Sequence, residues 1–134
     1  MQKLSFVIPA KNEEDSVSIL YDEIIKVLKN ITQKYEIIFI DDGSTDNTYS
    51  QLQKLHRKNK KIRIIKFRGN FGKSAALQTG FNQAKGNIIF TLDADLQDDP
   101  NEIPVFLKKI NEGYDLVSGW KKQRNDPSIS KVIP

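Results

Sequence analysis

Four aspartates follow an apolar segment in the stretch FTLDADLQDDP, which runs from residue 90 to residue 100. Asp93 and Asp95 are two positions apart, so in an extended chain their carboxylates point the same way. Two carboxylates held close together repel each other unless a cation lies between them. Mg²⁺ and Mn²⁺ prefer oxygen ligands, and Gln97 could add an amide oxygen or bind a metal-bound water. We therefore predict a divalent metal site at Asp93, Asp95 and Gln97 that would receive a diphosphate.

The neighbouring acids Asp98 and Asp99 have a simpler explanation. They precede Pro100 and a predicted helix, where negative charge favours the helix dipole, so we predict that they cap this helix. A calcium loop of the EF-hand type is excluded by spacing. If it began at Asp93, its sixth and twelfth residues would be Asp98 and Pro104 instead of Gly and Glu.

A second acidic pair, Asp41 and Asp42, begins the stretch DDGSTD at residues 41–46. An acid at the end of the second strand of an α/β sheet often binds a ribose hydroxyl. Nicotinamide enzymes also need a glycine-rich loop after the first strand, and the segment PAKNEE at residues 9–14 has no glycine. We therefore expect a nucleotide with its base and ribose near Asp41 and Asp42 and its diphosphate near Asp95. Residues 44–46 are expected to form a turn and a helix cap.

Two other features are given no catalytic role. Gly72-Lys73-Ser74 matches the end of a Walker phosphate loop, but Phe67 stands where that motif needs its first glycine. The single histidine, His56, lies in a basic helical stretch and is expected at the surface.

Strand-like and helix-like segments alternate along the chain. Strands are predicted at residues 4–9, 36–40, 62–67, 87–92 and 115–119. Helices are predicted at residues 13–31, with Asn12 as N-cap, and at 48–58, 73–84 and 101–111. Residues 121–134 have no clear period and are left unassigned. The alternation predicts a three-layer α/β/α fold with a mostly parallel sheet. Because such sheets bind ligands at the carboxyl ends of their strands, the polar clusters should meet at one edge.

Composition limits the classes of function. The chain has 134 residues, 38% of them hydrophobic, which fits one domain or part of one. It has no cysteine, signal peptide or apolar run of the roughly 20 residues that span a bilayer. The net charge is +4, with many cations between Lys54 and Arg68. That stretch is either a solvated surface or a face for anionic lipid headgroups. Phe67 is its single aromatic residue, which argues against nucleic-acid binding.

Four short motifs in order carry a resemblance to a known family: VIPAKNE at residues 7–13, DDGSTD at 41–46, NFGK at 70–73 and DADLQ at 93–97. Together they resemble the inverting family 2 glycosyltransferases of GT-A fold, and among them the bacterial polyprenyl-phosphate glycosyltransferases and dolichyl-phosphate mannosyltransferases. The resemblance implies that Mg²⁺ or Mn²⁺ binds at Asp93, Asp95 and Gln97. It implies that a UDP- or GDP-sugar contacts residues from all four motifs: Pro9, Ala10, Asn12, Glu13, Asp41, Asp42, Gly72, Lys73, Asp93, Ala94 and Asp95.

The resemblance also implies a reaction. The metal neutralises the nucleoside diphosphate leaving group, and an acceptor attacks the anomeric carbon from the opposite face. A lipid monophosphate acceptor is mostly ionised at pH 7, because its second pKa is about 6, whereas a saccharide acceptor would need a general base. Arg124, with Lys121 and Lys122, either meets the acceptor phosphate or forms an exposed basic loop. No catalytic residue is assigned.

Members of this family are longer than 134 residues. The resemblance therefore implies that residues 1–134 are the nucleotide-sugar-binding part, with the acceptor part and its catalytic residues beyond Pro134. We expect a role in cell-wall or surface polysaccharide synthesis, in the cytoplasm or at the cytoplasmic face of the membrane. The alternative is a nucleotide-sugar-binding fragment without catalysis. Peripheral membrane contact and a homo-oligomer fit the sequence, and the sugar, the nucleotide and the acceptor are left open.

Overall fold

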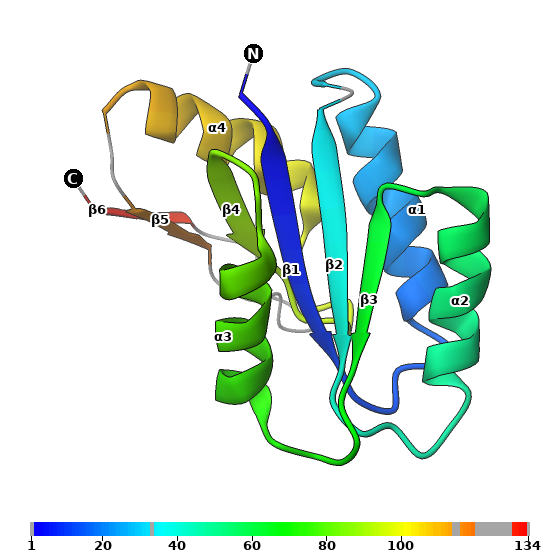
Figure 1. Cartoon of the computed structure of the whole chain (residues 1–134). Helices are drawn as coiled ribbons and strands as arrows, with labels where there is room; N and C mark the ends of the chain where they lie inside the picture. Colours follow the sequence, from blue (N-terminus) through cyan, green and yellow to red (C-terminus); the bar gives the residue numbers. More distant parts are fainter. Residues whose placement is uncertain (1, 33, 114–115, 120–129, 134) are drawn as a thin grey trace.

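The chain alternates strands and helices as predicted (Figure 1). The computed structural model describes residues 2–32, 34–113, 116–119 and 130–133. Its elements in chain order are β1 (Leu4–Ala10), α1 (Val17–Leu28), β2 (Tyr35–Asp41), α2 (Thr48–Lys58), β3 (Ile62–Lys66), α3 (Lys73–Gln83), β4 (Ile88–Thr91), the 3-10 turn η1 (Pro100–Glu102), α4 (Ile103–Asn111), β5 (Leu116–Gly119) and β6 (Ser130–Ile133). No described helix has the length and apolar character needed to cross a membrane.

Four strands form one parallel sheet in the order β3-β2-β1-β4. The register places Ala10 of β1 beside Asp41 of β2, and Asp41 beside Lys66 of β3. The strands β1, β2 and β3 therefore end at one common edge, which is the lower edge of the sheet in Figure 1, and β4 runs the same way but ends level with Val7. A separate antiparallel pair joins β5 to β6. The strand β6 was not predicted, because residues 121–134 show no period.

Helices cover both faces of the parallel sheet, which confirms the three-layer prediction. Phe6 and Ile8 of β1 belong to a core cluster that includes residues of α1, α2 and α4. Val7, between them, belongs to a second cluster with Ala76 of α3. Successive residues of a strand point to opposite faces, so the apolar run of β1 supplies both cores. In Figure 1, α3 accordingly lies on the opposite side of the sheet from α1 and α2.

The helix α3 approaches the sheet closely because it presents a glycine. A Cβ added at Gly80 would lie 2.2 Å from Cγ1 of Val7, so a larger side chain would push the helix away. Just beyond α3, the buried carboxylate of Glu36 accepts hydrogen bonds from Ser5 Oγ (2.6 Å), Lys85 N (2.6 Å) and Arg63 Nη1 (3.0 Å). Burial acts to raise the pKa of Glu36, but these bonds outweigh it and hold the pKa below its usual value.

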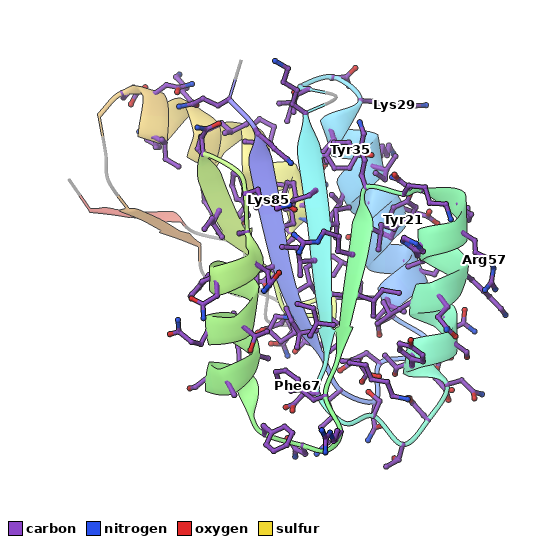
Figure 2. All side chains as sticks on the ribbon, viewed as in Figure 1. Tyr21, Lys29, Tyr35, Arg57, Phe67 and Lys85 are labelled. Carbon is purple, nitrogen blue, oxygen red and sulfur yellow. The ribbon has the colours of Figure 1, made fainter. Side chains whose placement is uncertain are left out.

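This network fixes the C-terminal end of α3 far from the edge where the strands end. Figure 2 shows Lys85 in the upper half of the sheet and Phe67 at the lower edge. With one end anchored at Glu36 and its middle held against β1, α3 has a fixed direction. Its N-terminal residue Lys73 is thereby placed at the lower edge.

The predicted start of the first helix was wrong. Helix α1 begins at Val17, with Ser16 in the N-cap position, and residues 13–16 form a turn instead. Asn12 was predicted to be the N-cap, but its backbone has φ +53° and its side chain bonds to another loop. Asparagine tolerates this left-handed conformation better than most residues do.

A glycine in the β2–α2 loop allows two loops to touch through their backbones. Gly43 has φ +72°, and a Cβ there would lie 2.4 Å from the carbonyl carbon of Gly69 and 2.5 Å from the nitrogen of Asn70. The β2–α2 loop and the β3–α3 loop therefore meet without any side chain between them.

Replacement of Gly43 by alanine should lower the free energy of unfolding by about 2–4 kcal/mol, because left-handed strain and a backbone clash add together. The matched control is Gly113→Ala. Gly113 also has a positive φ, of +106°, but its added Cβ would meet no atom within 4 Å. The control should cost only about 1 kcal/mol, from strain alone. Urea denaturation measures both values, and equal losses would contradict the close approach.

Candidate functional site

The residues predicted to bind a ligand follow the ends of β1, β2, β3 and β4, at the lower edge of the sheet in Figure 1. Pro9 and Ala10 end β1, and the carbonyl of Ala10 accepts a hydrogen bond from Asp42 N at 2.9 Å. Ala94 is 2% exposed and is part of the core. Arg124, Lys121 and Lys122 lie outside the described residues.

The loops after β1 and β2 are held together by reciprocal hydrogen bonds. The backbone N–H of Asn12 donates to Ser44 Oγ (2.9 Å), and Asn12 Oδ1 accepts from the N–H of Thr45 (2.8 Å). The N–H of Glu13 donates to Thr48 Oγ1 (2.9 Å). Asn12 and Glu13, which were predicted to bind the nucleotide, therefore also give this edge its shape.

Asp46 organises the start of α2, as predicted. Its Oδ1 accepts from the backbone N–H of Thr48 at 2.9 Å, and its Oδ2 accepts from the N–H of Glu14 at 3.3 Å. Burial acts to raise the pKa of Asp46, but the bonds from Thr48 and Glu14 keep it below the usual value. This carboxylate thus has a structural task, which is to join the loop after β1 to the start of α2.

Asp41 and Asp42 are both buried, at 0% and 5% exposure. Asp41 Oδ1 accepts from the N–H of Ser44 (3.0 Å), while its buried Oδ2 has no hydrogen-bond partner among the described residues. A buried acceptor without a donor is costly, so a ligand that supplies a donor here would be stabilised.

The carboxylate of Asp42 holds the loop after β3. It accepts hydrogen bonds from the backbone N–H of Phe71 (2.7 Å) and of Gly72 (3.1 Å). The ring of Phe71 is exposed and packs edge-on against Phe67, with 5.5 Å between the centroids. This role of Asp42 was not predicted, because its partners are backbone groups about 30 residues away along the chain.

The next residue, Lys73, connects the same loop to the acids after β4. Its ammonium lies 2.7 Å from Oδ1 and 2.9 Å from Oδ2 of Asp93. Three consecutive residues, Phe71 to Lys73, thus contact an acid after β2 and an acid after β4. Gly72 enables this turn into α3, since its φ of +97° is unfavourable for other residues.

The segment from Asp93 to Asp98 is a turn, so the premise that it is extended was wrong. Leu96 takes φ +66°, and the N–H of Gln97 donates to Asp95 Oδ1 at 3.1 Å. Asp95 and Gln97 are both exposed. The alternation of side chains along a strand therefore does not apply to Asp93 and Asp95.

The cap predictions for the neighbouring acids met different outcomes. Asp99 is the N-cap of η1 and accepts from the N–H of Asn101 at 3.0 Å, which confirms its predicted role. Asp98 instead accepts from the N–H of Asp93 at 2.7 Å, so its predicted helix cap was wrong. Burial, together with the charges of Asp95 and Glu102, raises the pKa of Asp98 to about 6, although Lys73 opposes the shift.

The donor chemistry of this edge suits a hard cation held partly by the protein. Among the residues that the structure describes, no three His, Cys, Asp or Glu side chains are grouped to hold a metal ion. Mg²⁺ in nucleotide sites needs only one or two carboxylates, because substrate phosphates complete its coordination. Asp93 already binds a cationic group, the ammonium of Lys73, and Asp95 is exposed nearby. The residues present therefore fit Mg²⁺ or Mn²⁺ bound together with a diphosphate.

Sequence comparison places this arrangement in a family. Residues 5–132 match the sequence model of Glycosyl transferase family 2. The chain belongs to this family. It is 44% identical to an undecaprenyl-phosphate 4-deoxy-4-formamido-L-arabinose transferase of Proteus mirabilis, over 98% of this chain and 41% of that protein. It is 38% identical to a dodecaprenyl-phosphate galacturonate synthase of Rhizobium johnstonii, over 98% and 40%. The chain thus spans about two fifths of the length of these relatives.

Solved structures of glycosyltransferases share the fold. A mannosyltransferase of Pyrobaculum calidifontis, in complex with GDP-Man and Mn²⁺, superposes with a TM-score of 0.79 at 23% identity, over 92% of this chain and 37% of that one. A glucosyl-3-phosphoglycerate synthase of Mycobacterium tuberculosis, in complex with Mn²⁺, UDP-glucose and phosphoglyceric acid, gives 0.64 at 24% identity, over 81% and 39%. The parallel sheet with its helices is the GT-A fold, as the sequence predicted.

If Asp42 positions the loop after β3, its replacement by alanine should release the amides of Phe71 and Gly72. Hydrogen bonds to a charged acceptor contribute about 1.5–3 kcal/mol, so hydrogen exchange at both amides should accelerate at least about tenfold. Hydrogen exchange measured by NMR tests this acceleration. The control is Asp22→Ala, which replaces an exposed acid of α1. Unchanged exchange at Phe71 and Gly72 would show that Asp42 does not hold the loop.

Proposed function

We propose that this chain is the donor-binding part of an inverting glycosyltransferase that transfers a sugar from a UDP- or GDP-sugar to a polyprenyl phosphate. One observation carries the proposal. The segment from Phe71 to Lys73 contacts Asp42 through its backbone and Asp93 through the Lys73 side chain. An acid after β2, an acid after β4 and the start of α3 are thereby connected at one edge of the sheet. This edge carries groups of the kinds that would bind a nucleoside and its diphosphate.

The nucleoside end of the donor is assigned to the β2 side of this edge. The Oδ2 of Asp41, which has no hydrogen-bond partner in the described part of the chain, is an acceptor for a donor group of the ligand, and the exposed ring of Phe71 lies on the neighbouring loop. Pro9, Ala10, Asn12 and Glu13 form the rim beside it. These residues would bind and orient the nucleotide without taking part in bond breaking.

The diphosphate end is assigned to the β4 side. Asp93, Asp95 and Gln97 would hold Mg²⁺ or Mn²⁺, which when bound neutralises negative charge on the leaving diphosphate. Gly72 offers a backbone without a side chain where the phosphates would pass, and Lys73 brings a positive charge to the same place. Support for the metal comes from the two structural neighbours that contain Mn²⁺.

The acceptor is proposed from the relatives, whose names specify undecaprenyl and dodecaprenyl phosphates. A phosphate monoester is largely ionised at pH 7 and can attack the anomeric carbon without a strong general base. The phosphate oxygen forms the new bond as the bond to the diphosphate breaks, which inverts the configuration. Contact of Arg124 with the acceptor phosphate stays a prediction.

Relatives that are transferases favour catalysis over the alternative of a binding module without activity. A lipid acceptor would place the full-length protein at the cytoplasmic face of a membrane. The basic stretch on α2 and β3 could assist peripheral contact, since Arg57 and Lys66 are exposed and Figure 2 shows Arg57 on the outer side of α2.

Calorimetry with UDP-glucose and GDP-mannose tests the donor site. In the presence of Mn²⁺ one donor should bind, and both EDTA and Asp95→Ala should weaken that binding at least about tenfold, because a metal ligand is worth more than 1.4 kcal/mol. Asp95 is exposed, so its loss should leave the fold intact, and Asp22→Ala on α1 is the matched control. Binding that ignores both EDTA and Asp95→Ala would contradict the metal site. A folded chain that binds neither donor would contradict the proposed function.

A further inference from the structure

The ion pair between Lys73 and Asp93 joins the start of α3 to the loop that follows β4. Lys73 is the first residue of α3, and Asp93 follows β4. The ammonium lies within 3 Å of both carboxylate oxygens, at 2.7 and 2.9 Å. The Asp93 side chain is 17% exposed, whereas the Lys73 side chain is 56% exposed. The carboxylate of Asp93 is therefore largely enclosed by the protein, whereas the side chain of Lys73 is largely exposed to solvent.

Another acid, Asp98, lies next to this pair and is also influenced by the ammonium. The backbone N–H of Asp93 donates to Asp98, whose pKa is raised by burial and then by the charges of Asp95 and Glu102, and is lowered by Lys73. Lys73 thus acts on the carboxylates of both Asp93 and Asp98. Its removal would leave the negative charge around Asp93 less compensated.

The base of the Lys73 side chain is fixed while its end is adaptable. The preceding residues, Phe71 and Gly72, are bound through their amides to Asp42, so the backbone at Lys73 has a defined position. From there a flexible four-carbon stem carries a compact charge. The ammonium can leave Asp93 for another anion nearby without any movement of α3.

A divalent ion at Asp93 and the ammonium of Lys73 would use the same carboxylate oxygens. Two cations held at one carboxylate repel each other, so the binding of either one disfavours the other. A metal that arrives alone must displace the ammonium from Asp93 and brings it no new anion in return. A metal that arrives with a diphosphate also provides the anion with which the ammonium can pair.

We propose that Lys73 is an exchangeable counter-ion of the donor site, which occupies Asp93 until a metal–nucleotide displaces it and then pairs with the diphosphate. This inference rests on the proposed function and goes beyond it. Its consequence is a coupling between metal and nucleotide: each should bind weakly alone and strongly together. Coupling between two ligands of one protein typically amounts to about 5–150-fold in affinity.

The variant Lys73→Gln tests separately the competition between Lys73 and the metal and the pairing of Lys73 with the diphosphate. Without the ammonium, Mn²⁺ alone should bind at least about fivefold more tightly than to the wild type, since no competitor remains at Asp93. UDP in the presence of saturating Mn²⁺ should bind at least about fivefold more weakly, because the diphosphate loses its cation. Two effects of opposite sign are not expected from damage to the fold, which would weaken both.

The measurement is Mn²⁺ binding followed by the electron paramagnetic resonance signal of free Mn²⁺, with and without UDP. Lys54→Gln, at an exposed position of α2, makes the same change of net charge away from the site and should match the wild type. Lys73→Arg keeps the cation and should retain weak binding of Mn²⁺ alone, which provides a second variant if Lys73→Gln fails to fold.

The outcomes separate the exchange from the donor site itself. If wild-type protein binds Mn²⁺ with UDP but Lys73→Gln binds Mn²⁺ alone no more tightly than Lys54→Gln does, the exchange is wrong and the donor site stands. If Lys73→Arg binds Mn²⁺ alone as tightly as Lys73→Gln, competition by charge is also wrong. If the folded wild type binds neither Mn²⁺ nor UDP, the proposed function fails, and the exchange fails with it.

Discussion

The crowding of carboxylates at one edge of the parallel sheet is the constraint on which the rest of this structure depends. Parallel pairing directs β1, β2, β3 and β4 to the same side of the sheet, so the acids after β2 and β4 lie on either side of β1 at that edge. Like charges there must be compensated, and three of the acids have different partners. Asp42 is bound by two backbone amides, Asp93 by the ammonium of Lys73, and Asp98 by one amide with a pKa raised to about 6.

Much of the remaining architecture serves to hold the compensating groups in place. The polar network around Glu36 fixes the far end of α3, and Gly80 lets that helix rest against β1. Gly43 lets the β2–α2 loop touch the backbone that leads to Phe71. The same groups that stabilise the edge are therefore those a nucleotide and its metal would engage.

Local pattern was sufficient to predict the fold but not the contacts of the site. The apolar runs and helical periods gave the order of elements, the bounds of α2 and the three layers, because each depends on nearby residues. Asn12 was misassigned because its side chain serves a loop more than 30 residues away. The turn at Leu96 has no local signal, since leucine seldom adopts a positive φ. Asp42 could be predicted as a site residue, but its backbone partners could not.

The family resemblance added what single residues cannot supply, namely a reaction and a class of ligand. Residues 5–132 match Glycosyl transferase family 2. The two relatives described above are named as a transferase and a synthase of undecaprenyl-phosphate and dodecaprenyl-phosphate sugars. The structure adds a physical link between the two acidic motifs through Phe71 to Lys73. This link explains why the NFGK motif accompanies the two acidic ones: it lies between them in space and contacts both.

The most direct test of this account is a crystal structure of the chain with Mn²⁺ and UDP, with the metal located by its anomalous scattering. The account predicts a manganese peak bonded to a carboxylate oxygen of Asp93 or Asp95, the uridine on the Asp41 side, and the Lys73 ammonium on a phosphate oxygen. A bound UDP with manganese away from both acids would contradict it, as would a nucleotide on any other part of the surface.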